Sequence, residues 1–409
     1  MNSRERIIAA LNHRKSDVIP IDFGAMRSTG ISIWAYQKLK EHLGLDTSTT
    51  KLYDVFQQLA EPEKEILDRL GADVVQVHRL AAAFGVKIDR WKAGDNGRGI
   101  KCMVPEDYHP IPMENGELTI QRDGKVLAKM PREGYYFDQT CHPLAEAEDA
   151  GDLESFTFPV ITEEEICYME QQAKDAYENT DRAVLMEFGG NILEAGESDF
   201  GFENFFMNLL AEPELVHAYL NRLSDSYIES LKSLMPRVQQ YIQIIQFGDD
   251  LGSQESTLIS KEVYREMIKP YHKKIFYYIR ENYPEVKVFL HSCGAILELI
   301  PDLVDAGVQI LNPIQIAAKG MDPETLVERF GDDLVFWGGG SNTQVTCNYG
   351  TVEEIQAEVK KLIQIFSKKN GYVFNQVHNL QANVPPEKIL AIYDAAQEYR
   401  KEQIQSGKY

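Results

Sequence analysis

The segment 289–294, with the sequence FLHSCG, places a histidine and a cysteine two positions apart at the end of an apolar run. In an extended segment, residues two apart point to the same side, so His291 and Cys293 can both reach one ion. Imidazole and thiolate together suit zinc. A buried cysteine beside a hydrogen-bonded histidine is the alternative interpretation, and two ligands do not make a site.

Other polar side chains also stand where apolar runs end. His378 ends the last run and can serve as a metal ligand, as a general acid near neutral pH, or as a brace for its loop. Glu187 follows a buried run, where a carboxylate costs free energy unless it is paired or bound. Asp249 and Asp250 lie between two glycines and form either part of a site or a helix cap. The full set of polar run ends is Asp22, His78, Glu187, Asp249, Asp250, His291, Cys293, Asn312 and His378.

Eight short apolar runs, rich in Val, Ile and Phe, must position these residues. They cover residues 18–22, 74–78, 184–188, 242–247, 286–291, 308–311, 334–338 and 372–377. Most are almost continuously apolar, as parallel strands buried on both faces are, and helical patterns lie between them. Eightfold strand–helix alternation predicts an α/β fold of the (β/α)8 TIM-barrel type, with active-site residues at the carboxyl ends of the strands. An open doubly wound sheet is the alternative, but no glycine-rich dinucleotide turn follows an early strand.

Residues 84–140 break this alternation. Asn115-Gly116 and Asp123-Gly124 each separate short β-prone runs, and these dipeptides are strong hairpin signals because the turn needs positive φ. We therefore predict one domain, residues 1–409, consisting of a barrel with a β-meander inserted after the second strand.

Composition excludes several classes of partner. A net charge of −21 opposes binding to nucleic acid or to an anionic membrane. No apolar run approaches the roughly 20 residues that span a bilayer, and the N-terminus lacks the apolar core of a signal peptide. Five sparse cysteines imply no disulfide framework, so we expect a reducing, cytoplasmic setting. We interpret Cys102, Cys141, Cys167 and Cys347 as structural, although Cys347 can in principle reach the barrel mouth.

The order of several motifs resembles the uroporphyrinogen decarboxylase family over nearly the whole chain, and this resemblance also implies a TIM barrel. The motifs are SRERIIAALNHR at 3–14, VIPID at 18–22, GAD at 71–73, GDDLG at 248–252, SKEVYREMIKPY at 260–271, HSCG at 291–294, GVQILNP at 307–313, WGGG at 337–340 and VHN at 377–379.

Members of the family that the chain resembles catalyse two kinds of reaction. Its decarboxylases use no metal, remove acetate carboxyl groups from a tetrapyrrole, and carry an arginine-rich segment for the substrate carboxylates. The corresponding stretch here, FGAMRS at 23–28, keeps only Arg27. An octacarboxylate substrate without an arginine clamp is unfavourable in so acidic a chain, which counts against this branch.

The second branch consists of zinc-dependent methyltransferases that work with methyl-corrinoid proteins, and its His-x-Cys motif ligates zinc. There the third ligand is a cysteine after the last strand, where this chain has His378 instead. The resemblance therefore implies a ligand set of His291, Cys293 and His378, with Glu187 as a further candidate. This harder ligand set would suit another substrate than a thiol, for example a methoxy donor or a pterin.

We predict a zinc-dependent methyltransferase that moves a methyl group between a corrinoid-binding protein and a small acceptor or donor, as a monomer or homodimer. The residues expected to act in catalysis are Glu187, Asp249 and His378, and those expected to contact substrate are Asp22, Arg27, His78, Asp250 and Asn312. One alternative is a metal-free carboxy-lyase that depends on His378, Asp73 and Arg27. Another is a catalytically silent partner subunit of a corrinoid protein.

Overall fold

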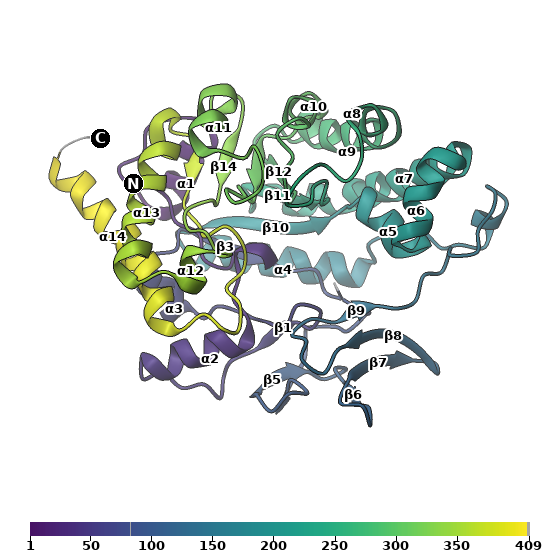
Figure 1. Cartoon of the computed structure of the whole chain (residues 1–409), viewed down its shortest axis with the longest axis horizontal. Coiled ribbons are helices and arrows are strands. Elements are labelled where there is room, and N and C mark those ends of the chain that lie inside the picture. Colours follow the sequence, from purple (N-terminus) through teal and green to yellow (C-terminus); the bar gives the residue numbers. More distant parts are fainter. Residues whose placement is uncertain (82, 407–409) are drawn as a thin grey trace.

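The computed structural model describes residues 1–81 and 83–406, and a curled seven-stranded parallel sheet lies at its centre (Figure 1). The strands, in sheet order, are β15 (Tyr372–Val373), β14 (Val335–Trp337), β13 (Ile310–Asn312), β12 (Lys287–His291), β11 (Ile244–Gly248), β10 (Ala183–Gly189) and β3 (Val74–Val77). Each strand of the sheet pairs with the sheet strands that come before and after it along the chain, and β4 to β9, between β3 and β10, lie outside this sheet. The order therefore never reverses, as it must at the switch point of an open doubly wound sheet.

The extended segment around Ile21 lies between the two edge strands of this sheet. Ile21 forms a parallel bridge with Phe374, just after β15. On its other side, its carbonyl oxygen accepts a 2.7 Å hydrogen bond from the backbone N–H of Asp73, just before β3. The Asp73 carboxylate accepts from the N–H of Ile21 and forms ion pairs with Arg6 and Arg400. The first predicted run thus lies beside both edges, and the fold is TIM-barrel-like.

Helices surround the sheet in Figure 1. They are α1 (Ser3–Leu11), α2 (Ile33–His42), α3 (Lys64–Leu70), α4 (Glu163–Asn179), α5 (Leu193–Phe200), α6 (Phe202–Ala211), α7 (Pro213–Val238), α8 (Lys261–Val263), α9 (Lys269–Asn282), α10 (Ile300–Ala306), α11 (Pro323–Phe330), α12 (Thr346–Tyr349), α13 (Val352–Phe366) and α14 (Pro386–Ser406). One wider helical turn, Tyr264–Ile268, joins α8 to α9. Among the described residues, no helix combines the length and the apolarity that crossing a bilayer requires.

Two separate apolar clusters explain the near-continuous apolar strands. Side chains on one face of each strand pack inside the curled sheet, with Phe289 and Trp337 as the largest, 5.4 Å apart between ring centroids. Ile7, Ala10 and Leu11 of α1 belong to this inner cluster, and Arg6 of α1 pairs with Asp73 just before β3, so α1 packs against the cluster at the amino ends of the strands. Side chains on the opposite face pack against the surrounding helices.

The chain between β3 and α4 forms antiparallel strands, seen at the lower right of Figure 1. They are β4 (Trp91–Asp95) and β5 (Lys101–Pro105), then β6 (Ile111–Pro112), β7 (Leu118–Arg122), β8 (Lys125–Met130) and β9 (Asp138–Gln139). Both residues of the Asp123-Gly124 turn between β7 and β8 have positive φ, which is the conformation that favours this dipeptide in a hairpin. A smaller pair, β1 (Leu52–Asp54) and β2 (Leu59–Ala60), precedes α3.

Candidate active site

A layer of polar side chains lies above the inner apolar cluster, because strand residues two apart share a face. The inward apolar residues Leu185, Ile244, Phe289 and Ile310 are each followed, two positions on, by a polar residue. These polar residues are Glu187, Gln246, His291 and Asn312. Their strands are neighbours in the sheet, so the four side chains meet at its carboxyl edge.

Three of the predicted residues form a compact group at this edge. One ligand atom from each of His291, Cys293 and His378 lies within 4.8 Å of those from the other two. The Cys293 sulfur is 3.5 Å from Nε2 of His291. Zinc–nitrogen and zinc–sulfur bonds of about 2.0–2.1 and 2.3 Å, at a tetrahedral angle, place the two atoms about 3.5 Å apart. The observed separation therefore fits this pair of zinc ligands.

Asn312 selects the nitrogen that His291 offers to the group. Nδ2 of Asn312 donates to the carbonyl oxygen of Trp337, which leaves Oδ1 as the acceptor for Ser28 Oγ and for Nδ1 of His291, 2.8 Å away. His291 must therefore carry its proton on Nδ1, so that the lone pair of Nε2 points toward Cys293. Metal-binding histidines are commonly oriented by such a partner.

Burial controls the charge of the other two members. Burial, together with neighbouring His291, lowers the pKa of His378 to about 4, so its imidazole is neutral at physiological pH, as a metal ligand must be. Burial, with Asp250 beside it, raises the pKa of the Cys293 thiol well above its ordinary value. A thiolate at this position therefore requires a cation.

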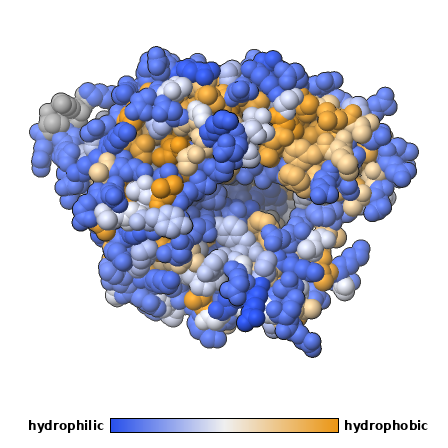
Figure 2. All heavy atoms as spheres, viewed as in Figure 1, coloured by the Kyte–Doolittle hydropathy of each residue, from blue (hydrophilic) through white to orange (hydrophobic). Residues whose placement is uncertain are grey.

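This group borders a cavity of about 350 Å³, the hollow near the centre of Figure 2. His291, His378 and Asp250 are among the residues that line it. Asp250 connects the cavity to the candidate metal-binding group of His291, Cys293 and His378. Its Oδ1 accepts a 2.8 Å hydrogen bond from the Cys293 N–H and lies 3.6 Å from Nε2 of His291. The volume is at the lower end of the roughly 300–1,000 Å³ typical of small-molecule sites.

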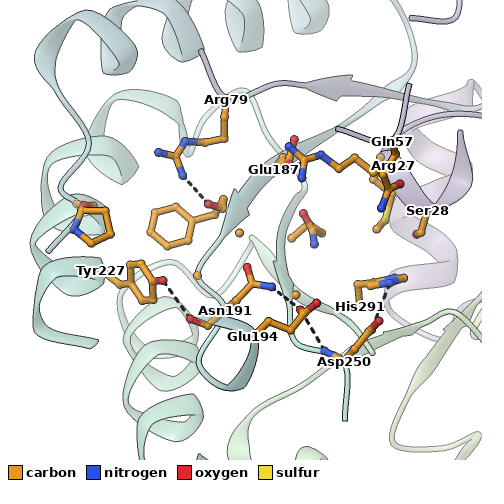
Figure 3. A pocket seen from close by; sticks show the side chains of 18 of the residues that line it. Arg27, Ser28, Gln57, Arg79, Glu187, Asn191, Glu194, Tyr227, Asp250 and His291 are labelled. Carbon is orange, nitrogen blue, oxygen red and sulfur yellow. Dashed lines mark hydrogen bonds and ion pairs between the residues drawn. The ribbon is translucent and has the colours of Figure 1, made fainter. Parts of the chain in front are cut away.

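The two arginines of the cavity are already engaged by carboxylates. Arg27 Nε is 2.6 Å from Asp54 and 3.3 Å from Glu187, and Figure 3 shows Arg27 and Glu187 facing each other in one wall. Although burial opposes its charge, these two carboxylates raise the pKa of Arg27. Arg79 forms a two-bond pair with Glu165 and donates to the carbonyl oxygen of Phe188.

Sequence reasoning missed Asn191, Glu194, Arg79 and Tyr227, which all line the cavity. Asn191 donates to Glu194 at 2.6 Å, and Tyr227 donates to the carbonyl oxygen of Asn191 (Figure 3). Arg79 lies two residues after the end of β3, next to His78, so the strand-end criterion should have included it. Asn191 and Glu194 lie just beyond the Gly189-Gly190 turn and in the first turn of α5, a position that the criterion did not reach. Tyr227 lies inside α7, and nothing in the sequence distinguishes it from the other tyrosines.

Several predicted residues do not line this cavity. Asp22 is fully buried in the barrel wall, where it accepts hydrogen bonds from Trp337 Nε1 and the Ala25 N–H. His78 is buried, and its Nε2 lies 3.4 Å from Oε1 of Glu61. Asn312 lies beneath His291 rather than in the cavity wall.

Asp249 and Asp73 also lie away from the cavity. Asp249, predicted to be catalytic, instead accepts from the N–H groups of Leu193 and Glu194 at the start of α5, and lies 2.9 Å from Nε2 of His272. Asp73, which the carboxy-lyase alternative requires, lies before β3, at the opposite end of the strands from the cavity. Cys347 is buried in α12. Among the described residues, Cys293 is the one cysteine of the candidate metal-binding group.

A TIM-barrel-like fold with a polar cavity at the carboxyl edge of its strands has the arrangement of a barrel enzyme. The family model for uroporphyrinogen decarboxylase (URO-D) matches residues 191–399, which make up half of the chain and include the candidate metal-binding group. The chain belongs to this family, whose members named below are enzymes.

Curated relatives are distant. Uroporphyrinogen decarboxylase from Psychromonas ingrahamii is 28% identical over 207 residues, covering 50% of this chain and 54% of the relative. That from Chlorobium limicola is 24% identical over 260 residues, covering 60% and 69%. The chain therefore spans about half of the first relative's length. Among solved structures, the Ignisphaera aggregans GH53 catalytic domain is similar with a TM-score of 0.39 and 12% identity. The match covers 93% of this chain and 99% of that one.

Proposed function

We propose that this chain is a zinc-dependent methyltransferase that moves a methyl group between a corrinoid-binding protein and a small acceptor or donor. The observation that carries the proposal is the convergence of His291, Cys293 and His378 at the edge of the cavity. Zinc bound by these residues would act as a Lewis acid on the sulfur or oxygen of the small substrate. We also propose that residues 1–409 form one domain, with 84–140 as an insertion.

The chain's own residues support this chemistry. Asn312 holds the His291 imidazole with Nε2 available, and burial keeps His378 neutral. One thiolate and two neutral imidazoles leave a bound zinc ion with a net positive charge, which suits an electron-rich oxygen or sulfur. Asp250 can balance that charge from the cavity wall, because it lies 3.6 Å from His291.

The cavity is less suited to a substrate rich in carboxylates. Arg27 and Arg79 are each already paired with carboxylates, and Glu187, Glu194 and Asp250 add further acidic groups to the lining. A polyanionic tetrapyrrole would meet these acids without a free arginine clamp.

The test measures zinc directly, without assuming a substrate. Wild-type protein, Cys293→Ala and His378→Ala are purified and their zinc content is measured by mass spectrometry. Cys167→Ala, which removes an exposed cysteine outside the group, is the control. We expect about one zinc per chain in the wild type and in the control, and a loss of most of the metal in the other two variants. A wild type that retains no metal after incubation with zinc would remove the basis of the proposal.

The relatives' names favour a second candidate, a carboxy-lyase of the uroporphyrinogen decarboxylase type. It predicts loss of carboxyl groups from uroporphyrinogen and activity that survives chelation of metals. Incubation of the purified protein with uroporphyrinogen, with and without a chelator, distinguishes this candidate from the first. A catalytically silent partner subunit would instead bind a corrinoid protein equally well after His291 or Cys293 is replaced.

A further inference from the structure

The three members of the candidate metal-binding group are held in different ways. His291 ends β12 and Cys293 follows it closely, so the central sheet positions both side chains. His378 lies instead beyond the end of β15, in residues 374–385, which form neither a helix nor a strand. We call this stretch the His378 loop. The position of the third ligand therefore depends on the contacts that this loop makes.

Two backbone hydrogen bonds anchor the His378 loop to neighbouring parts of the chain. The N–H of Val377 donates to the carbonyl oxygen of Ser341 at 3.0 Å, and the N–H of Leu380 donates to that of Gly30 at 3.0 Å. The two residues between these anchors are the ligand itself and Asn379. The contacts of the Asn379 side chain therefore contribute to holding the ligand in place.

The Asn379 side chain is buried and forms hydrogen bonds through both ends of its amide group. Nδ2 donates to Oε1 of Gln57 at 3.0 Å, and Gln57 lines the cavity (Figure 3). Oδ1 accepts from the hydroxyl group of Tyr136 at 3.0 Å and from Nε2 of Gln381. Burial lowers the pKa of His378, and a hydrogen bond with the Asn379 side chain partly opposes this effect, so these two side chains are in contact.

Tyr136 belongs to the antiparallel segment that precedes α4, 243 positions away from Asn379 along the chain. It lies between β8 and β9. The next residue, Phe137, is fully buried, and its N–H donates to the carbonyl oxygen of Phe56 at 3.0 Å. These contacts fix the backbone beside Tyr136, so its hydroxyl group meets the loop in a defined position.

We propose that Tyr136 is a positioning residue of the metal site, which acts through Asn379 to hold His378 at the edge of the cavity. The antiparallel segment thereby contributes to metal binding, although it supplies none of the three ligands. This inference rests on the zinc site of the proposed function. Tyr136 is not among the residues that line the cavity, so its effect falls on the affinity for zinc and not on contacts with a substrate.

A preformed third ligand strengthens zinc binding, because a loop that is already ordered loses less conformational entropy when the metal binds. Asn312 orients His291 from a neighbouring strand. For His378, the side chains of Asn379 and Tyr136 take this part, and partners of this kind commonly affect metal affinity. Loss of the Tyr136 hydroxyl group should therefore loosen one of the three ligands and leave the other two in place.

The experiment compares Tyr136→Phe with Tyr135→Phe. Both variants lose one phenolic hydroxyl group and keep the aromatic ring, and the two positions are adjacent in the sequence. Tyr135 is a matched control, because it is 49% exposed and its ring pairs with Trp34. The zinc affinity of the metal-free proteins is measured by competition with a chromogenic chelator, and their free energy of unfolding is measured by urea denaturation.

We expect Tyr136→Phe to weaken zinc binding by about 3- to 10-fold, the effect of one neutral hydrogen bond, and Tyr135→Phe to bind zinc as the wild type does. Asn379→Ala should weaken zinc binding at least as much as Tyr136→Phe. The double variant should bind zinc as tightly as Asn379→Ala alone, because the hydroxyl group acts through Asn379. The comparison of the two tyrosine variants decides the question even where Asn379→Ala does not fold.

Other outcomes overturn the inference in distinguishable ways. A lower free energy of unfolding of Tyr136→Phe with unchanged zinc affinity would show that the hydroxyl group only supports the fold. Equal zinc affinities of the two tyrosine variants, or a further loss of affinity in the double variant, would also overturn the inference. In each of these cases the wild type still binds zinc and the proposed function stands, whereas a wild type that binds no zinc would overturn both.

Discussion

The amide oxygen of Asn312 lies 2.8 Å from Nδ1 of His291, and the amide nitrogen of Asn312 is held by the carbonyl oxygen of Trp337. Three neighbouring strands, β12, β13 and β14, thereby fix one imidazole at the edge of the cavity. The orientation of His291 is a property of the barrel itself and does not depend on a flexible loop.

Replacing Asn312 with alanine should weaken zinc binding without removing any ligand. The His291 ring would lose the acceptor that keeps its proton on Nδ1, and removing such a partner commonly costs about 10–100-fold in metal affinity. Competition with a chromogenic chelator measures this change. Asn312→Asp, which retains the acceptor oxygen, should bind zinc more tightly than Asn312→Ala, and equal affinities in the two variants would contradict the assigned role.

Replacing Asp249 with alanine should destabilise the protein. Asp249 caps the first turn of α5 and pairs with buried His272, so the variant loses a helix cap and leaves a buried imidazole without its acceptor. We expect the free energy of unfolding to fall by about 2–4 kcal/mol. Urea denaturation followed by circular dichroism measures this, with Glu178→Ala as the control, because Glu178 is an exposed residue of α4. A change within about 0.5 kcal/mol, typical of surface sites, would show that the cap is dispensable.

The buried carboxyl group of Asp22 should make stability depend on pH. Burial raises its pKa in the folded protein to about 6, above the ordinary 3.8. The folded state therefore holds the proton more tightly than the unfolded state, and this contribution to stability is lost as pH rises through 6. The unfolding free energy of wild type minus that of Asp22→Asn should fall by about 2–3 kcal/mol between pH 4 and pH 7. A difference independent of pH would mean that Asp22 is ionised throughout.

Asp73 should matter for stability and not for the site. Its carboxylate pairs with Arg6 and Arg400 and accepts from the Ile21 N–H, at the end of the strands opposite the cavity. Asp73→Asn breaks a buried ion-pair network, for which losses of about 3–5 kcal/mol are usual. Thermal and urea unfolding measure this loss. Zinc content of the folded variant should equal that of the wild type, and a selective loss of zinc would contradict this assignment.

The sequence predicted much of the fold, because eight apolar runs separated by helical patterns leave few arrangements open. Seven of the runs are strands of one parallel sheet, and the run containing Ile21 lies between its edges. The helical patterns expected between the runs include α13, whose apolar residues Ile355, Val359 and Ile363 are buried. The boundaries were less accurate: the run 372–377 contains only the two-residue strand β15.

The site was predictable only in part. Polar residues at strand ends led to His291, Cys293 and His378, which the structure brings together. The same criterion cannot tell which way a side chain points once the strand has ended. Asp22 turns into the wall toward Trp337, and Asp249 turns toward α5. Glu194 was missed because it belongs to a helix, and its proximity to Asp250 depends on how α5 packs against the next loop.

The position of Ile21 between Phe374 and Asp73 also has a consequence for biosynthesis. Ile21 and Phe374 are more than 350 positions apart along the chain, whereas Ile21 and Asp73 are close in sequence, and Arg400, which pairs with Asp73, lies in α14. Such distant contacts form late, because a long loop must close first. A nascent chain on the ribosome can therefore join Ile21 to Asp73 early, but the ring stays open on the β15 side until Phe374 emerges, and this closure is the last step in forming the ring.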